Sequence, residues 1–121
     1  MEFMALVYGD PDAWERLSET ERTTAYEGYM AVSRDAAAAG ALVDASELES
    51  TGAATSVRVR SGEALVTDGP YAEVKESLGG YYLFSCDTLE DAIAWAAKIP
   101  AAWTGGAIEL RPVHVAEEAA S

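Results

Sequence analysis

Charged side chains that could do chemistry gather in one short segment, residues 66–76. It contains Asp68-Gly69-Pro70, a turn sequence in which glycine permits a positive φ, proline fixes its own φ, and aspartate accepts backbone hydrogen bonds. Asp68 is the candidate general acid or base and Glu73 the second candidate, because a carboxylate can exchange a proton with a substrate. In the alternative interpretation Asp68 only caps the turn, and the charged residues after it form a solvated face.

Five further side chains are candidates for ligand binding. Two are tyrosines, which would orient a substrate, and three are basic, of which Lys75 or Arg58 would hold a negative charge on the substrate. Arg58 also has a simpler interpretation, in which it offsets the acidic surface of the chain. The five candidates are Lys75, Tyr8, Tyr82, Arg58 and Arg111.

Motifs for metal or phosphate chemistry are missing from the sequence. It has no phosphate-binding loop and no nucleophile elbow. His114 is the only histidine and Cys86 the only cysteine, which excludes the usual zinc clusters. We therefore expect no metal and no cofactor. Cys86 lies in an apolar run and is interpreted as a small buried side chain.

Size and charge limit the class of protein. The 121 residues, half of them hydrophobic, suffice for one domain with a real core. Eight basic and 21 acidic residues give a formal net charge of −13, which opposes binding to nucleic acid or to an anionic membrane surface. The sequence has no long apolar span, no signal peptide pattern and no possible internal disulfide, so we expect a cytoplasmic protein.

The elements that must position these residues follow from periodicity and caps. Ser18 with Glu21 and Thr88 with Asp91 have the spacing of helix N-caps, and Ser61-Gly62 is typical of a tight hairpin turn. The first helix is predicted to end at Gly40 and the second at Pro100. Strands are predicted over residues 2–8, 42–48, 55–60, 80–86 and 107–113, with a further strand after the hairpin turn.

Each predicted helix carries an apolar stripe that we expect to lie against the sheet. The order of elements is strand, helix, strands, strand, helix, strand, which predicts an α+β, ferredoxin-like βαββαβ fold with an extra hairpin strand. It forms one domain over residues 1–115, followed by a short acidic tail over 116–121. The first stripe is Tyr26, Tyr29, Met30, Ser33, Ala36, Ala37 and Gly40, and the second is Leu89, Ala92, Ile93, Ala96 and Ile99.

Two strands are apolar on both faces, which predicts a homodimer. In the first strand one face carries Phe3, Ala5 and Val7. The other face carries Met4, Leu6 and Tyr8. The helices can cover only one of these faces. The other face would expose more apolar surface than a monomer normally leaves open, and a two-fold dimer packed sheet to sheet would cover it. The loop at 68–76 would then form a wall of the cleft beside the sheet.

Several segments resemble one known family. Asp68-Gly69-Pro70-Tyr71-Ala72-Glu73, with Lys75-Glu76 and Gly79-Gly80-Tyr81-Tyr82, resembles the signature of the DGPF proteins, a branch of the YCII-related family. Leu6-Val7-Tyr8-Gly9-Asp10 and the segments 95–100 and 109–113 also resemble that branch, so the likeness covers almost the whole chain. It implies a dimeric α/β barrel built from ferredoxin-like subunits.

The resemblance implies less about activity. Genes for DGPF proteins often lie beside those for extracytoplasmic-function sigma factors, which implies a regulatory or stress-linked role. YCII-type relatives include a dehydrochlorinase of hydroxylated aromatics, for which a His–Asp pair has been proposed as the site. The family histidine lies early in the first helix, where residues 21–26 of this chain contain none. Only Asp68 can therefore be carried over from that pair.

Three functional hypotheses follow. In the first, the chain is a small-molecule enzyme with Asp68 as general acid or base in a cleft of the dimer. In the second, it is a non-catalytic ligand-binding or regulatory module, for which the missing histidine is no obstacle. The third is haem binding with His114 as axial ligand, which is the weakest because a lone histidine indicates no particular ligand.

Overall fold

The computed structural model describes residues 1–71 and 76–116. Glu73 and Lys75 and the tail from residue 117 onward lie outside the described residues. The elements are, in chain order, β1 (Glu2–Gly9), α1 (Pro11–Glu15), α2 (Glu19–Ala38), β2 (Leu42–Glu47), the 3₁₀ turn η1 (Thr51–Ala53), β3 (Thr55–Arg60), β4 (Glu63–Asp68), β5 (Ser77–Ser85), α3 (Leu89–Ala96), the 3₁₀ turn η2 (Pro100–Ala102) and β6 (Ala107–Pro112).

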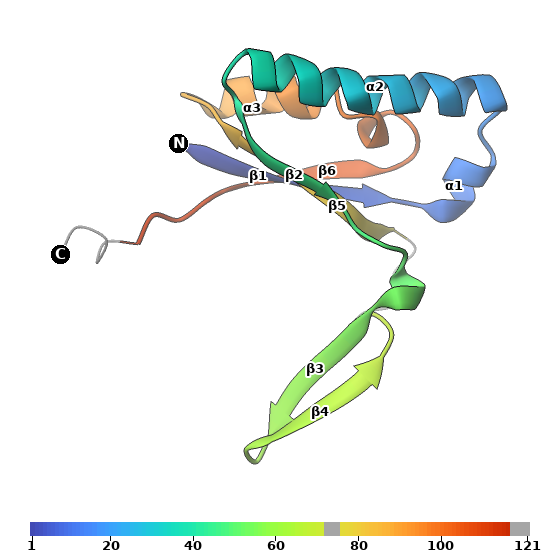
Figure 1. Cartoon of the computed structure of the whole chain (residues 1–121), viewed down its shortest axis with the longest axis vertical. Coiled ribbons are helices and arrows are strands. Elements are labelled where there is room, and N and C mark those ends of the chain that lie inside the picture. The colour runs from blue at the N-terminus through green and yellow to red at the C-terminus, as the bar shows by residue number, and fades with distance from the viewer. Residues whose placement is uncertain (72–75, 117–121) are drawn as a thin grey trace.

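Four strands form one antiparallel sheet in the order β2-β5-β1-β6. Helices α2 and α3 both lie on one face of this sheet, and no helix of the described residues covers the opposite face, here called the open face (Figure 1). This arrangement confirms the α+β, ferredoxin-like prediction. Pro112 ends β6, which is an edge strand, where a residue without a backbone N–H breaks no internal ladder.

The core lies between the sheet and its two helices. Phe3, Phe84 and Ile99 are among its largest fully buried side chains. Tyr82 stacks on Phe84 with 5.6 Å between ring centroids, and Phe84 stacks on Trp95 at 6.2 Å. The residues of β1 and β5 therefore divide between two faces, as their alternation predicts, and one face is buried beneath the helices.

Caps define the start of each long helix. The Ser18 hydroxyl accepts the Glu21 backbone N–H at 3.1 Å, and a Glu21 carboxylate oxygen accepts the Ser18 N–H at 2.9 Å. The Thr88 hydroxyl likewise accepts the Asp91 N–H at 3.2 Å. Both predicted caps are confirmed. The Ser18 hydrogen bonds lower the pKa of the Glu21 carboxyl, because they favour its charged form.

The predicted apolar stripes are only partly correct. On α2 the buried residues are Ala25, Val32 and Ala36, whereas Tyr26 and Met30 are 59% and 69% exposed. On α3, Leu89 and Ile93 are also exposed. The reason is that small side chains bring each helix close to the sheet on a narrow face, so the larger neighbours lie beyond the line of contact.

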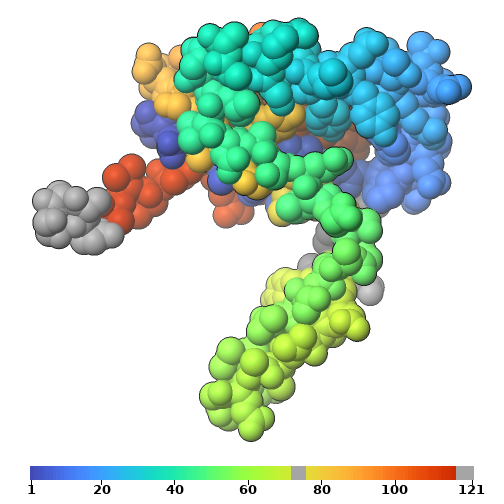
Figure 2. Space-filling model, in the orientation of Figure 1, coloured from blue at the N-terminus to red at the C-terminus, as the bar shows by residue number. Residues whose placement is uncertain are grey.

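Strands β3 and β4 form a separate two-stranded sheet. This hairpin projects away from the body of the molecule as an arm (Figures 1 and 2). Ser61 and Gly62 both have positive φ, 51° and 80°, as a two-residue turn matching the twist of the strands requires. Every residue of the two strands except Ser56 is exposed. Among the described residues, no helix is both long and apolar enough to span a membrane.

Candidate functional site

A cleft of about 930 Å³ opens between α2 and one end of the sheet. Residues from β1, α1, α2, β2, β5 and the turn η2 line it, so almost every part of the body contributes. Its surface is largely apolar and aromatic. The aromatic residues of the lining are Trp14, Tyr26, Tyr29, Tyr81 and Tyr82.

The short helix α1 forms one wall of the cleft. It begins at Asp10, whose carboxylate accepts the Asp12 N–H at 2.9 Å, and proline occupies the first helical position. Its other end is fixed by Arg22 of α2, which donates to the carbonyl oxygens of Trp14, at 3.2 Å, and Glu15, at 2.7 Å. These bonds hold Trp14 at the rim of the cleft.

Trp14 and Tyr26 meet edge to face at this rim. Their ring centroids lie 5.4 Å apart and the rings are inclined at 77°. This is a favourable geometry for two aromatic quadrupoles. Tyr26 and Met30, which do not reach the core, thus form the α2 side of the cleft.

Tyr29 and Tyr82 lie deeper in the cleft, on the helix and on the sheet. Burial raises the pKa of both phenols above their ordinary value of 10.0, and the negative charge of nearby Glu47 adds to the rise. A hydrogen bond with Ser33 opposes the rise at Tyr82. Phenols are neutral near pH 7 in any case, and the rise keeps these two protonated further into the alkaline range. Both tyrosines therefore offer hydroxyl groups that can donate and accept.

Glycine permits the close strand approach at the end of the sheet that lines the cleft. A Cβ atom built at Gly80 would lie 2.7 Å from the Ser46 carbonyl oxygen, and one at Gly106 would collide with the carbonyl oxygen of Tyr8. Side chains at these two positions would push the strands apart. The lack of side chains here is part of what shapes the cleft.

The charge of the lining is acidic. Asp10 and Glu47 belong to it, and no lysine or arginine does among the described residues. Asp10 is buried and caps α1, whereas Glu47 is exposed at the end of β2. The described lining therefore combines aromatic walls with two carboxylates, of which that of Asp10 accepts the Asp12 N–H.

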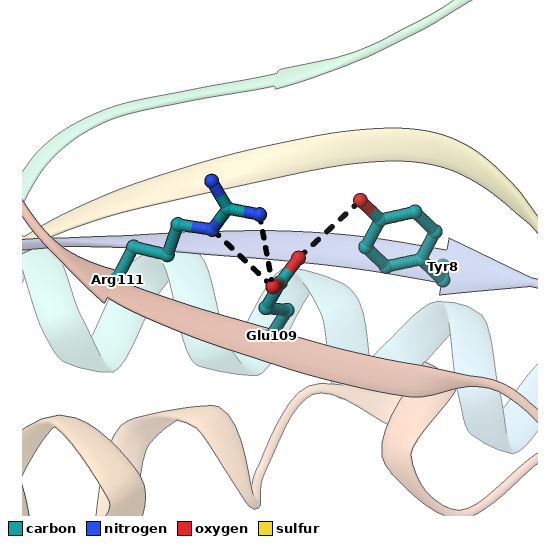
Figure 3. Close-up of polar contacts among 3 residues, drawn as sticks. All are labelled: Tyr8, Glu109 and Arg111. Carbon is teal, nitrogen blue, oxygen red and sulfur yellow. Dashed lines mark hydrogen bonds and ion pairs between the residues drawn. The ribbon is translucent and has the colours of Figure 1, made fainter.

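Apart from the cleft, a polar cluster of Tyr8, Glu109 and Arg111 lies on the open face of the sheet (Figure 3). Tyr8 donates its hydroxyl to Glu109 at 3.4 Å, and Arg111 holds the other oxygen of the same carboxylate through Nε, at 3.2 Å, and Nη2, at 3.1 Å. Across the face, the Tyr81 hydroxyl donates to Asp44 at 2.8 Å. Between the three-residue cluster and this pair lie apolar side chains of β1 and β5.

The hairpin arm carries Asp68 and Arg58. Asp68 is the last residue of β4, opposite Thr55, and is exposed. The backbone after it is tied by a 2.7 Å hydrogen bond from the Gly69 N–H to the Ala54 carbonyl. Arg58 lies over the ring of Tyr71 at 4.7 Å.

The predicted site residues are thus divided among three places. Tyr82 lines the cleft, Tyr8 and Arg111 share a carboxylate on the open face, and Asp68 and Arg58 lie on the arm. Glu73 and Lys75 lie outside the described residues. The roles assigned to all seven residues stay predictions.

Sequence reasoning missed Trp14 and Glu47 and assigned Tyr26 and Met30 to the core. The available signal was the turn Gly9-Asp10-Pro11, because an N-cap followed by proline begins a helix. That helix would have indicated a second wall beside α2.

Two comparisons relate the chain to known proteins. The family model described as the YCII-related domain matches residues 1–117. An uncharacterized protein of Rhizobium meliloti (strain 1021) is 35% identical over 114 residues, which cover 93% of this chain and 92% of that protein. The likeness therefore extends over nearly the full length of both chains.

Proposed function

The chain belongs to the YCII-related domain family, and from that premise we propose that it binds a small molecule in the cleft between α2 and the sheet. The observation that carries this proposal is a cleft of about 930 Å³ with aromatic walls. Small-molecule sites typically have volumes of about 300 to 1,000 Å³ and are lined by apolar and aromatic residues with few polar groups.

The polar groups of the cleft would orient the ligand. Tyr29 on α2 and Tyr82 on β5 present hydroxyls that are neutral near pH 7, as phenols ordinarily are. Ser33, which is on α2 like Tyr29, also lines the cleft. A compact aromatic or apolar molecule with one or two hydrogen-bonding groups fits this arrangement.

Thermal unfolding in the presence of small aromatic compounds tests the proposal. A ligand that binds only the folded chain stabilises it, by about 2.7 kcal/mol at one hundred times its dissociation constant. Met30→Ala, which removes part of the α2 wall, should weaken this effect. Ile93→Ala is the matched control, since Ile93 is an exposed apolar residue on α3 outside the cleft. Equal ligand effects in both variants would refute the cleft as the site.

An enzymatic role for Asp68 is the second proposal. Its support is the fixed geometry of the turn, in which the Ser56 hydroxyl donates to the Gly69 carbonyl at 2.7 Å, next to the Gly69–Ala54 bond. These bonds fix the backbone directly after Asp68, and an exposed carboxylate at such a position can exchange protons with a substrate. Asp68→Asn should then abolish turnover of a bound compound while its stabilising effect persists. Turnover that survives the substitution would remove Asp68 from any catalytic role.

We also propose that the chain forms a homodimer through the open face of the sheet. The support is the partly exposed apolar strip of Met4, Leu6 and Leu83, which lies on the face that no helix covers (Figure 1). Burying such a strip against a second copy would remove it from water. The cleft lies beside α2, so this interface would leave Trp14, Tyr26 and Tyr29 in place, whereas Tyr81 reaches the open face.

A further inference from the structure

We propose that the arm formed by β3 and β4 packs one face of its ribbon against a second copy of this chain. This inference rests on the proposed homodimer and adds a second contact to the one at the open face. Three observations carry it: the division of the arm into an apolar and a polar face, the extent of surface that a stable dimer needs, and the charge of the arm.

The two faces of the arm differ in character. Residues paired across an antiparallel ladder point to the same face, and successive residues of a strand alternate between the faces. The register of β3 and β4 therefore puts every valine of the arm on one face and both of its arginines on the other. Leu65 is the one large apolar residue of the polar face. The apolar face carries Thr55, Val57, Val59, Ala64, Val66 and Asp68.

The apolar face of the arm is open to solvent in the single chain. Val57, Val59 and Val66 are 61%, 70% and 65% exposed. A ribbon that met water on both sides would need no division into faces, since alternation of apolar and polar residues is typical of strands with one buried side. A two-stranded ribbon also has little stability of its own until an apolar face is packed. The pattern therefore indicates a partner for this face.

The surface that a stable dimer needs favours a second copy as that partner. A standard interface takes about 20 to 30 residues from each side. The four strands of the sheet have 8, 6, 9 and 6 residues, about half of which point to the open face, so this face supplies about 15. The six residues on the apolar face of the arm bring the total to about 20.

The arm lies where a second copy could reach it. It extends from the sheet on the side away from the helices, which is the side of the open face (Figures 1 and 2). A copy seated on the open face would therefore have the arm beside it. The two contacts would form one continuous interface.

The charge of the arm suits the same partner. The two strands contain two arginines, one glutamate and one aspartate, so their formal charges cancel and the net charge of −13 resides on the rest of the chain. Two such acidic bodies repel one another, whereas a neutral ribbon approaches an acidic body without that repulsion. The arm is thus a part of the chain whose charge does not oppose association.

Two lysine substitutions at neighbouring positions of β4 test the inference. Val66→Lys puts the new charge on the apolar face and Thr67→Lys puts it on the polar face, with the same change in net charge. Both residues are β-branched and exposed, so neither substitution disturbs the core. Sedimentation over a series of concentrations gives the dissociation constant of the dimer. We expect Val66→Lys to raise it at least about tenfold, because a two-fold dimer loses the buried valine twice, and Thr67→Lys to leave it within about threefold of the wild type.

NMR on a mixture of ¹³C-labelled and unlabelled copies observes the contact directly. We expect nuclear Overhauser effects between the methyl groups of Val57, Val59 and Val66 in the labelled copy and protons of the unlabelled copy. The Val66→Lys sample, compared at the same concentration, should lose these signals.

The outcomes separate the arm from the dimer. If the wild type sediments as a monomer at micromolar concentration, the proposed dimer and this inference both fail. If it is a dimer and the two lysine variants dissociate alike, the dimer stands but the apolar face of the arm makes no contact in it, and the inference is overturned. A dimer without signals between the valine methyl groups and the second copy overturns it as well.

Discussion

Tyr29 on α2 and Tyr82 on β5 both line the cleft, and their protonation gives the site a measurable signature. Because burial raises the pKa of each phenol above 10.0, the folded chain holds both protons at a pH where the unfolded chain has begun to lose them. Their contribution to stability is therefore fully present below about pH 10 and is lost as the pH rises through the raised values.

This pH dependence can be checked by urea unfolding at a series of alkaline pH values. We expect the free energy of unfolding to fall with pH more gently in Tyr82→Phe than in the wild type, because one of the two shifted groups is gone. Tyr71→Phe is the control, since Tyr71 is 75% exposed. A wild type and a Tyr82→Phe variant with the same slope would show that Tyr82 titrates as it does in the unfolded chain.

Single residues were predictable where the signal was local. The hydrogen bonds of Ser18 and Thr88 depend only on residues three positions away, and both caps are present. Tyr26 and Met30 have helical spacing but lie outside the contact, because which part of an apolar face touches the sheet depends on the tilt and approach of the whole helix. Spacing alone does not contain that information.

Helix α2 and the turn η2 meet at Gly28, which makes the contact sensitive to one methyl group. A Cβ atom at this position would lie 2.8 Å from Cγ of Pro100 and 3.5 Å from Cζ2 of Trp103. The proline ring is rigid, so the helix or the turn would have to move. The turn η2 contributes Ala101 to the cleft, so such a movement would reach the site.

Gly28→Ala should therefore destabilise the chain. The substitution gains about 1 kcal/mol of helix propensity, but overpacking costs about 1–3 kcal/mol, so we expect a net loss of up to about 2 kcal/mol in the free energy of unfolding. Thr24→Ala, on the exposed side of the same helix, should show no such loss. An increase in the free energy of unfolding for Gly28→Ala would mean that the turn η2 moves aside at little energetic cost.

Helices and strands were predictable where the sequence carries local signals for them, such as turn residues or a periodic apolar pattern. Ser61-Gly62 indicated the hairpin turn, and the alternating apolar runs indicated the strands of the sheet. Helix α1 has only five residues, too few for a periodic pattern, and was missed. The direction in which the hairpin projects has no sequence signal.

For the molecule as a whole, the open face of the sheet is the surface on which the proposed dimer depends. Leu6 lies at the middle of this face, with Tyr81 on one neighbouring strand and Glu109 on the other. Leu6→Arg should shift a dimer to monomers, because it buries a charge in an apolar contact. Ile93→Arg on the outer side of α3 should leave the dimer intact.

Sedimentation at micromolar concentration measures both variants. A wild type that sediments as a monomer would refute the proposed dimer, whatever the variants do. A dimer in which Leu6→Arg has no effect would place the interface elsewhere.

The cleft itself was the least predictable feature. Its lining residues range from Val7 to Gly106, and only the closed fold brings them together. The described candidates from the DGPF-like segment were close in sequence, yet the structure places Asp68 on the arm and Tyr82 in the cleft. Proximity along a chain is a poor guide to proximity in space when the residues belong to two separate sheets.

In the single chain, the hairpin of β3 and β4 should unfold locally before the rest of the molecule. A two-stranded ribbon without a packed face is at best marginally stable in water, whereas β1 and β5 lie at the centre of the sheet with the core beneath them. Backbone amides of β3 and β4 should exchange with deuterium long before those of β1, by local melting that leaves the sheet intact. The protein then has two cooperative units, and a protease could cut the arm while the body stays folded.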